Sequence, residues 1–202
     1  MFYETAKNDH GLPHNPFKAL VAPRPIGWIT AMNAAGEINL SPYSFFNAVS
    51  DRPDMVVFSS DGHKDALVFA EETGEFVCSL ATFELRDQMN ATAAPLRRGE
   101  NEMLHAGLTP APSRLVKPPR VAESPVALEC KWLKTVALEP IGAPARYYLA
   151  VGQVIGVYIA DEFIVDGLVD TAAMRPIARA GYHDYFVATP ETKFSIRRPS
   201  GG

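Results

Sequence analysis

Apolar residues in this chain occur in short runs separated by glycine, proline and polar turns. Runs with alternating or continuous β-type character predict strands at residues 26–32, 37–40, 45–49, 55–60, 75–80, 126–136, 147–160, 163–165, 185–187 and 194–196. Helical spacing is confined to residues 65–72 and 85–90. Many short strands with few helices are typical of a closed antiparallel barrel. We therefore expect a mainly β fold, a β-barrel with peripheral helices, formed by residues 1–202 as a single domain.

Turn-forming residues mark where the predicted strands bend or end. Gly36 closes a predicted hairpin, because glycine adopts a positive φ without strain. Gly152 and Gly156 interrupt a long predicted strand and indicate bends or bulges at a barrel corner. Residues 1–18 are polar and turn-rich, which predicts an N-terminal arm lying over the domain or over a partner subunit. Residues 92–120 have no clear period, so we interpret them as a long loop that is either functional or poorly ordered.

Charge and composition exclude several classes of function. The 202 residues carry a formal net charge of −4, whereas general binders of nucleic acid or anionic membranes need a basic surface. No run approaches the roughly 20 apolar residues of a membrane helix, and the N-terminus lacks a signal-peptide pattern. We therefore expect a cytoplasmic protein with no nucleic-acid partner and no membrane partner.

Motifs for other cofactors are missing from the sequence. No dinucleotide-binding glycine motif, P-loop or hydrolase motif is present. Cys78 and Cys130 lie in strand-like runs and are interpreted as buried free thiols. His10 and His14 are the only histidines with ligand-like spacing, and their Pro/Gly segment favours solvated or packed side chains. No metal site is expected.

Hydroxyl and amide side chains are interleaved with aromatic ones on consecutive predicted strands. Ser41, Ser44, Asn47 and Ser50 have near-regular spacing among phenylalanine and tyrosine. Buried polar groups cost free energy unless they find hydrogen-bond partners. A flat, amphipathic, hydrogen-bonding ligand such as an isoalloxazine ring would provide partners for them. The alternative for residues 41–44 is a plain turn.

Lys64 directly precedes the predicted helix at residues 65–72. Helix N-termini present free N–H groups and the positive end of the helix dipole, which suits a phosphate. Lys64 would add a charge-assisted contact. The alternative is a solvated helix start with Asp65 as its N-cap.

These segments resemble the flavin reductase-like family of FMN-binding split-barrel proteins. The resemblance is carried by residues 24–30 (Arg-Pro-Ile-Gly-Trp-Ile-Thr), residues 39–47 (Asn-Leu-Ser-Pro-Tyr-Ser-Phe-Phe-Asn), Lys64-Asp65, residues 72–77 and residues 178–185. It extends in the expected order over nearly the whole chain. It implies a split barrel and a homodimer with FMN near the subunit interface.

The resemblance also implies three groups of cofactor-binding residues. Those that would flank the flavin ring are Trp28, Ile29 and Thr30. Those that would face the polar edge of the ring are Ser44, Phe45, Phe46 and Asn47. Those that would approach the ribityl phosphate or the edge of the cofactor are Ser59, Lys64, Asp65, Tyr182 and Tyr185.

One position departs from the family pattern at the phosphate end. Family members often carry a hydroxyl residue after Lys-Asp, where this chain has Ala66. We expect this phosphate contact to be lost, to be replaced by a water, or to be supplied by Arg97 or Arg98.

The activity implied by the resemblance is that of an FMN-dependent NAD(P)H:flavin oxidoreductase, with NAD(P)H as co-substrate and free flavin or an oxygenase component as acceptor. The hydride chemistry belongs to the flavin, so no catalytic acid or base is required. His183 is the one catalytic candidate, with a structural role as the alternative. Three other interpretations stay open: an FMN-containing electron carrier, a non-enzymatic flavin-binding protein, and a split barrel for haem or pyridoxal phosphate.

Overall fold

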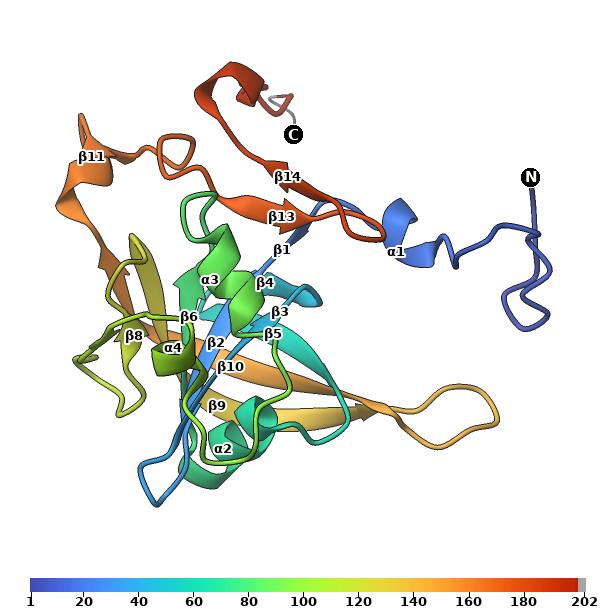
Figure 1. Cartoon of the computed structure of the whole chain (residues 1–202). Coiled ribbons are helices and arrows are strands. Elements are labelled where there is room, and N and C mark those ends of the chain that lie inside the picture. The colour runs from blue at the N-terminus through green and yellow to red at the C-terminus, as the bar shows by residue number, and fades with distance from the viewer. Residues whose placement is uncertain (200–202) are drawn as a thin grey trace.

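Strands form most of the regular structure over residues 1–199, the part of the chain that the computed structural model describes (Figure 1). The strands are β1 (Arg24–Pro25), β2 (Gly27–Met32), β3 (Ile38–Tyr43), β4 (Phe46–Asp51), β5 (Asp54–Asp61), β6 (Glu75–Leu80), β7 (Pro110–Ala111), β8 (Arg120–Val121), β9 (Val126–Leu138), β10 (Tyr147–Ile159), β11 (Ile164–Val165), β12 (Leu168–Val169), β13 (Ile177–Arg179) and β14 (Tyr185–Val187). The helices are α1 (Phe17–Leu20), α2 (Asp65–Thr73), α3 (Arg86–Ala91) and α4 (Glu102–His105), with 3-10 turns η1 (Asp161–Phe163) and η2 (Pro190–Thr192). The predicted mainly β fold with peripheral helices is confirmed.

One antiparallel sheet of seven strands forms the barrel, in the order β3-β2-β6-β9-β10-β5-β4. The long strand β10 pairs with β9 on one side and with β5 on the other. Its register against β9 shifts at Gly152 and Gly156, as the sequence predicted. A Cβ at Gly152 would lie 2.2 Å from Cζ of Phe76, so only glycine fits against this interior ring. The hairpin between β9 and β10 extends well beyond the barrel (Figure 1).

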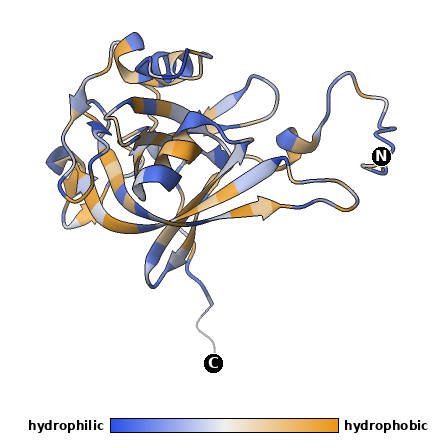
Figure 2. Ribbon diagram, turned by 90° about the horizontal axis from the view of Figure 1, so that it is seen from below, coloured by the Kyte–Doolittle hydropathy of each residue, from blue (hydrophilic) through white to orange (hydrophobic). Residues whose placement is uncertain are grey.

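Helix α2 closes one end of the barrel, and the view from below shows it surrounded by strands (Figure 2). It packs against β2, β3, β6 and β9. Its buried residues Leu67 and Phe69 join Phe58 and Phe76 in the apolar cluster inside the barrel. The helix ends before Gly74, which has a left-handed φ of 72°. The same element that completes the core therefore directs its N-terminus toward the rim of the barrel.

A second apolar cluster lies on the outer face of β2. Trp28 packs there with Met89 of α3, Met103 of α4 and Ile177 of β13. Ile29, the next residue along the strand, belongs to the cluster inside the barrel. Because side chains alternate between the two faces of a strand, β2 is buried on both sides.

Three segments differ from their predicted structure. The predicted loop at residues 92–120 contains α4 and β7, and β7 pairs with β8 at its end. Helix α4 begins here because the Asn101 side chain caps it by accepting a hydrogen bond from the Met103 N–H at 2.9 Å. The strand predicted at residues 194–196 is wrong: these residues have no regular structure and no partner strand. The strand predicted at residues 37–40 continues through Pro42, because β3 is an edge strand, where a missing N–H is tolerated.

The N-terminal segment reaches the barrel beside the small sheet of β1, β13 and β14 (Figure 1). Arg24 anchors it, with hydrogen bonds from its guanidinium to the carbonyl oxygens of Lys18, Val21 and Ala180. No helix in residues 1–199 is long and apolar enough to cross a membrane. Cys78 and Cys130 are buried and free, as predicted.

Candidate functional site

A cavity of about 550 Å³ lies at the rim of the barrel, between β3, β5, the N-terminus of α2 and the segment that follows α3. Its wall contains both polar and aromatic side chains. The lining residues are Lys18, Asn39, Ser41, Pro42, Tyr43, Ser44, Phe45, Ser59, Asp61, Lys64, Asp65, Glu102, Tyr147 and residues 92–96.

Two hydroxyl groups in this wall are buried without a hydrogen-bond partner among residues 1–199. They are Oη of Tyr43 and Oγ of Ser59. The Tyr43 and Ser59 side chains are only 8% and 9% exposed. Burial raises the pKa of Tyr43 to about 12, although the neighbouring Ser60 hydroxyl opposes the shift. Orphaned buried hydroxyls are costly, and they indicate a cavity built to hydrogen-bond a ligand.

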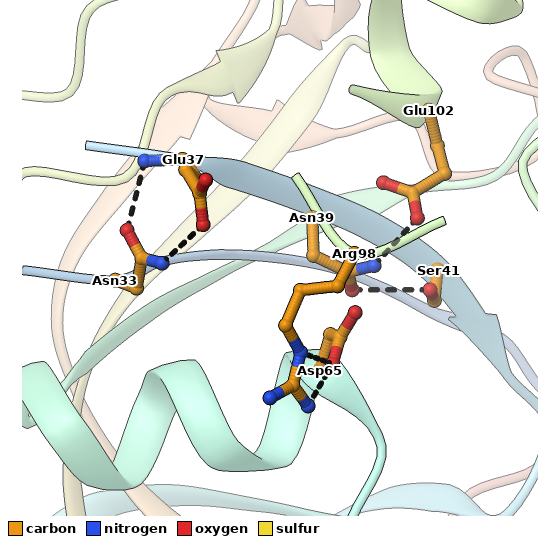
Figure 3. Close-up of polar contacts among 7 residues, drawn as sticks. All are labelled: Asn33, Glu37, Asn39, Ser41, Asp65, Arg98 and Glu102. Carbon is orange, nitrogen blue, oxygen red and sulfur yellow. Dashed lines mark hydrogen bonds and ion pairs between the residues drawn. The ribbon is translucent and has the colours of Figure 1, made fainter. Parts of the chain in front are cut away.

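The β3 side of the cavity is held by a buried carboxylate (Figure 3). Glu102 of α4 accepts hydrogen bonds from Nδ2 of Asn39 at 2.7 Å and from the N–H of Leu40 at 3.0 Å. Oδ1 of Asn39 in turn accepts a hydrogen bond from the Ser41 hydroxyl at 3.1 Å. Burial raises the pKa of Glu102, although these hydrogen bonds oppose the shift. The network therefore fixes the orientation of the Asn39 amide and of the Ser41 hydroxyl in the cavity wall.

The other end of the cavity is net cationic, because Lys64 lies there beside two carboxylates that are each paired with an arginine, Asp61 with Arg146 and Asp65 with Arg98. Lys64, and not Asp65, is the N-cap residue of α2, and its side chain makes no cap hydrogen bond. The Asp65 carboxylate instead accepts hydrogen bonds from Nε of Arg98 at 2.8 Å and from Nη2 at 2.6 Å (Figure 3). Free N–H groups at the start of α2, Lys64 and Arg98 together make a site that suits a phosphate. Ala66 is 1% exposed and packs into the barrel core, whereas Arg98 reaches this end of α2 through its contact with Asp65.

A second ion pair lies close to this cationic end. Nε of Arg146 contacts Oδ1 of Asp61 at 2.7 Å, and Nη2 of Arg146 contacts Oδ2 at 2.9 Å. Hydrogen bonding from Arg146 lowers the pKa of Asp61. Asp61 is therefore an anion already paired with its own guanidinium, which limits its repulsion of a phosphate at Lys64.

The structure brings five of the predicted cofactor-binding residues into this cavity. They are Ser44, Phe45, Ser59, Lys64 and Asp65. It does so because the bend between β3 and β4 lies against β5, where the Ser59 N–H donates a hydrogen bond to the Phe45 carbonyl at 2.8 Å. The polar and aromatic interleaving seen in the sequence thus follows the rim of one cavity.

Five other predicted residues do not line it. Trp28, Ile29 and Thr30 are 0% exposed within β2, and Nε1 of Trp28 donates a hydrogen bond to Oγ1 of Thr92 at 2.9 Å. Phe46 lies against Gly27, and Asn47 is exposed on β4. The local pattern could not distinguish a strand covered on both faces from a strand facing a ligand.

The C-terminal candidates line neighbouring cavities. Tyr182 lines a cavity of about 750 Å³. His183 and Tyr185 line a cavity of about 410 Å³ together with residues of α3. Tyr185 also lines a smaller cavity of about 180 Å³, which shares Ser44 with the rim cavity.

Sequence reasoning missed several residues of the rim cavity outside the 39–47 motif. They include Lys18, Asp61, Glu102, Tyr147 and residues 92–96. Glu102 lies in the segment without a period, where only the Asn101-Glu102 pair, an N-cap followed by an acidic residue, signals a helix start. Lys18 and Tyr147 carry no local signal, because only the tertiary fold brings them to the rim.

Three comparisons relate the chain to known proteins. The flavin reductase like domain matches residues 20–173. An uncharacterized protein of Halalkalibacterium halodurans is 34% identical over 185 residues, which cover 89% of this chain and 88% of that protein. Nitrilotriacetate monooxygenase component B from Bacillus cereus is 27% identical with a TM-score of 0.86, over 97% of this chain and 98% of that chain. 2-Nitrobenzoate 2-nitroreductase from Pseudomonas fluorescens shares the fold, with a TM-score of 0.84 at 24% identity over 100% of both chains.

Proposed function

The chain belongs to the flavin reductase-like family, and from this premise we propose that it is an FMN-dependent oxidoreductase. In this proposal NADH or NADPH is the reductant, and free flavin or an oxygenase component receives the electrons. The rim cavity carries the proposal, because its orphaned hydroxyls, its aromatic wall and its cationic end match the three parts of FMN.

The residues of the rim cavity fit FMN from end to end. Lys64, Arg98 and the N-terminus of α2 would hold the phosphate. The hydroxyls of Tyr43 and Ser59 would donate to polar atoms of the cofactor and so lose the cost of being buried unpaired. Phe45 and Tyr147, with ring centroids 6.2 Å apart, would form the apolar wall. Bound FMN would supply the hydride-transfer chemistry.

The protein's own contribution is placement. The Glu102, Asn39 and Ser41 network holds hydrogen-bonding groups at fixed positions, so that binding costs little side-chain ordering. His183 lies in a neighbouring cavity and is not needed for this role.

We further propose that the chain acts as a cytoplasmic homodimer. The hairpin of β9 and β10 exposes Leu133, Leu138 and Ile141, and such side chains are commonly covered by a second subunit. Buried, free Cys78 and Cys130 are in keeping with a reducing compartment. Sedimentation velocity would report a single species of twice the chain mass, whereas a monomer at micromolar concentration would contradict the dimer.

Absorbance spectroscopy tests the proposed activity. The purified protein saturated with FMN is mixed anaerobically with NADH or with NADPH, and flavin absorbance is followed. We expect bleaching by at least one nucleotide and turnover when free flavin is added in excess. Binding of FMN without bleaching by either nucleotide would contradict the reductase and favour an electron carrier. Failure to bind FMN would contradict the flavin site itself.

A further inference from the structure

A second large cavity adjoins the rim cavity at the base of the N-terminal segment. Its volume is about 750 Å³, and it shares Lys18 and Ser44 with the rim cavity. One side is formed by the segment that precedes α1, which contributes Asn8 and Asn15. The opposite side is formed by β1 and the turn between β13 and β14. A ligand in this cavity would therefore lie directly beside the proposed FMN site.

The charge of this cavity is entirely positive. Lys18, Arg24 and Arg179 line it, and none of its lining residues is acidic. Within residues 1–199, none of these three cations forms an ion pair. Arg179 is held by the Tyr182 carbonyl oxygen and by the Tyr185 hydroxyl, both of which are neutral. Like charges gathered without a counterion repel one another, so the cavity is better suited to an anion than to solvent alone.

Arg24 lies deepest of the three. Its side chain is 6% exposed, and its Nε is buried without a hydrogen-bond partner among residues 1–199. Burial and the nearby charge of Arg179 lower the pKa of Arg24. An arginine remains charged under these conditions, so a bound anion would stabilise it.

The cavity also meets the wall of the rim cavity at one aromatic ring. Lys18 Nζ and Arg24 Cζ each lie 5.9 Å from the ring centroid of Phe45. Phe45 itself lines the rim cavity. A molecule with its anionic part between Lys18 and Arg179 would thus reach past Phe45 toward the proposed flavin ring.

We propose that this cavity binds the pyrophosphate of a nicotinamide dinucleotide, with Lys18 and Arg179 as its charged contacts. The inference rests on the proposed function, because the dinucleotide is the reductant named there. A pyrophosphate matches three cations better than a single carboxylate, which would leave two positive charges uncompensated. Asn8 and Asn15 supply neutral hydrogen-bonding groups for the rest of the ligand.

Calorimetric titration of FMN-saturated protein with NAD⁺ and, separately, with NADP⁺ tests this site. Both nucleotides are already oxidised, so their binding is measured without turnover. Lys18 is exposed, so its substitution is compatible with folding. We expect Lys18→Gln and Arg179→Gln each to raise the Kd of the bound nucleotide about tenfold. Lys18→Arg keeps the charge and retains most of the affinity. Lys134→Gln, an exposed lysine on β9 that lines none of the cavities described above, is the matched control.

Each outcome of this titration decides the inference. Weakened binding in both Gln variants, with a normal Kd in the control, supports it. Unchanged binding in both, or failure of NAD⁺, NADP⁺ and inorganic pyrophosphate all to bind the unsubstituted protein, overturns it. Competition by benzoate but not by pyrophosphate would also overturn it, because it would indicate a carboxylate pocket. If NADP⁺ binds more weakly to the Gln variants but NADPH does not bleach the flavin, the anion site is supported and the reductase activity is contradicted. Failure of the site can therefore be distinguished from failure of the proposed function.

Discussion

Nδ2 of Asn39 donates a hydrogen bond to Oε1 of Glu102 at 2.7 Å, and it joins β3 to α4 across 63 residues of chain. Both carboxylate oxygens of Glu102 are used, since Oε2 accepts a hydrogen bond from the Leu40 N–H. The contact decides which way the Asn39 amide faces, and through it the Ser41 hydroxyl. Glu102, which is distant from β3 in sequence, thus orients the hydrogen-bonding groups that β3 contributes to the cavity wall.

Glu102→Ala is expected to destabilise the protein by about 2–3 kcal/mol, because two buried donors lose their acceptor. Glu102→Gln is expected to cost less, since Asn39 can rotate its amide by 180° and pair its oxygen with the new NH₂ group. Urea unfolding followed by circular dichroism measures both values. Equal stability of Glu102→Ala and the unsubstituted protein would show that the network is not structural.

The raised pKa of Tyr43 predicts that the protein loses stability in strong alkali. Its folded-state pKa of about 12 lies above its ordinary value of 10.0. The folded protein therefore retains the phenolic proton while the unfolded chain loses it, and stability falls as pH rises from 10 to 12. The loss amounts to at most about 2–3 kcal/mol. Tyr43→Phe removes this contribution, so its unfolding free energy should fall less over the same range. Parallel pH profiles for the two proteins would contradict the assignment.

Substitution of Lys64 is expected to weaken the binding of FMN but not of riboflavin, because the two flavins differ by the phosphate. We expect Lys64→Gln to raise the Kd of FMN about tenfold, because a charge-assisted phosphate contact is lost. The Kd of riboflavin should stay the same. Quenching of flavin fluorescence measures both constants, and Lys134→Gln serves as the control. An equal loss for both ligands would place Lys64 away from the phosphate.

Arg98 and Asp65 predict a compensating pair of substitutions. Arg98→Gln leaves the Asp65 carboxylate unpaired beside the proposed phosphate, so FMN binding should weaken about tenfold. Asp65→Asn releases Arg98 from its ion pair, so FMN binding should be retained or strengthened. In the double variant, removal of the Asp65 charge should restore part of the affinity lost in Arg98→Gln. The same fluorescence titration measures all three variants, and strictly additive effects would argue against direct coupling.

Adding one methyl group at Gly181 is expected to displace the N-terminal segment from the barrel. A Cβ at Gly181 would lie 2.4 Å from Cβ of Ala19 and 2.7 Å from its Cα. Gly181→Ala should therefore push α1 away from the β13–β14 turn, at a cost of about 1–3 kcal/mol. Trypsin cleavage after Lys18 should become several-fold faster. Adding Ala19→Gly removes the closer contact and should restore part of the protection. Unchanged cleavage would mean that the turn moves instead.

Local pattern determined the parts of this protein that depend on neighbours in sequence. Strand periodicity, the left-handed residue Gly36 and the bends at Gly152 and Gly156 were all predictable, because each acts within a few residues of chain. Ser44 was also identified in advance, since polar residues among aromatic ones are an unusual local pattern, and Lys64 was identified because it directly precedes a helix.

Only the tertiary structure decided which side chains share a cavity. Closure of the barrel buries Trp28 on the outer face of β2 instead of at the rim, and it brings Glu102 to Asn39. It also places Arg24 beside Arg179, on strands that pair across the length of the chain. These contacts result from long-range strand pairing and packing, which no pattern of adjacent residues encodes.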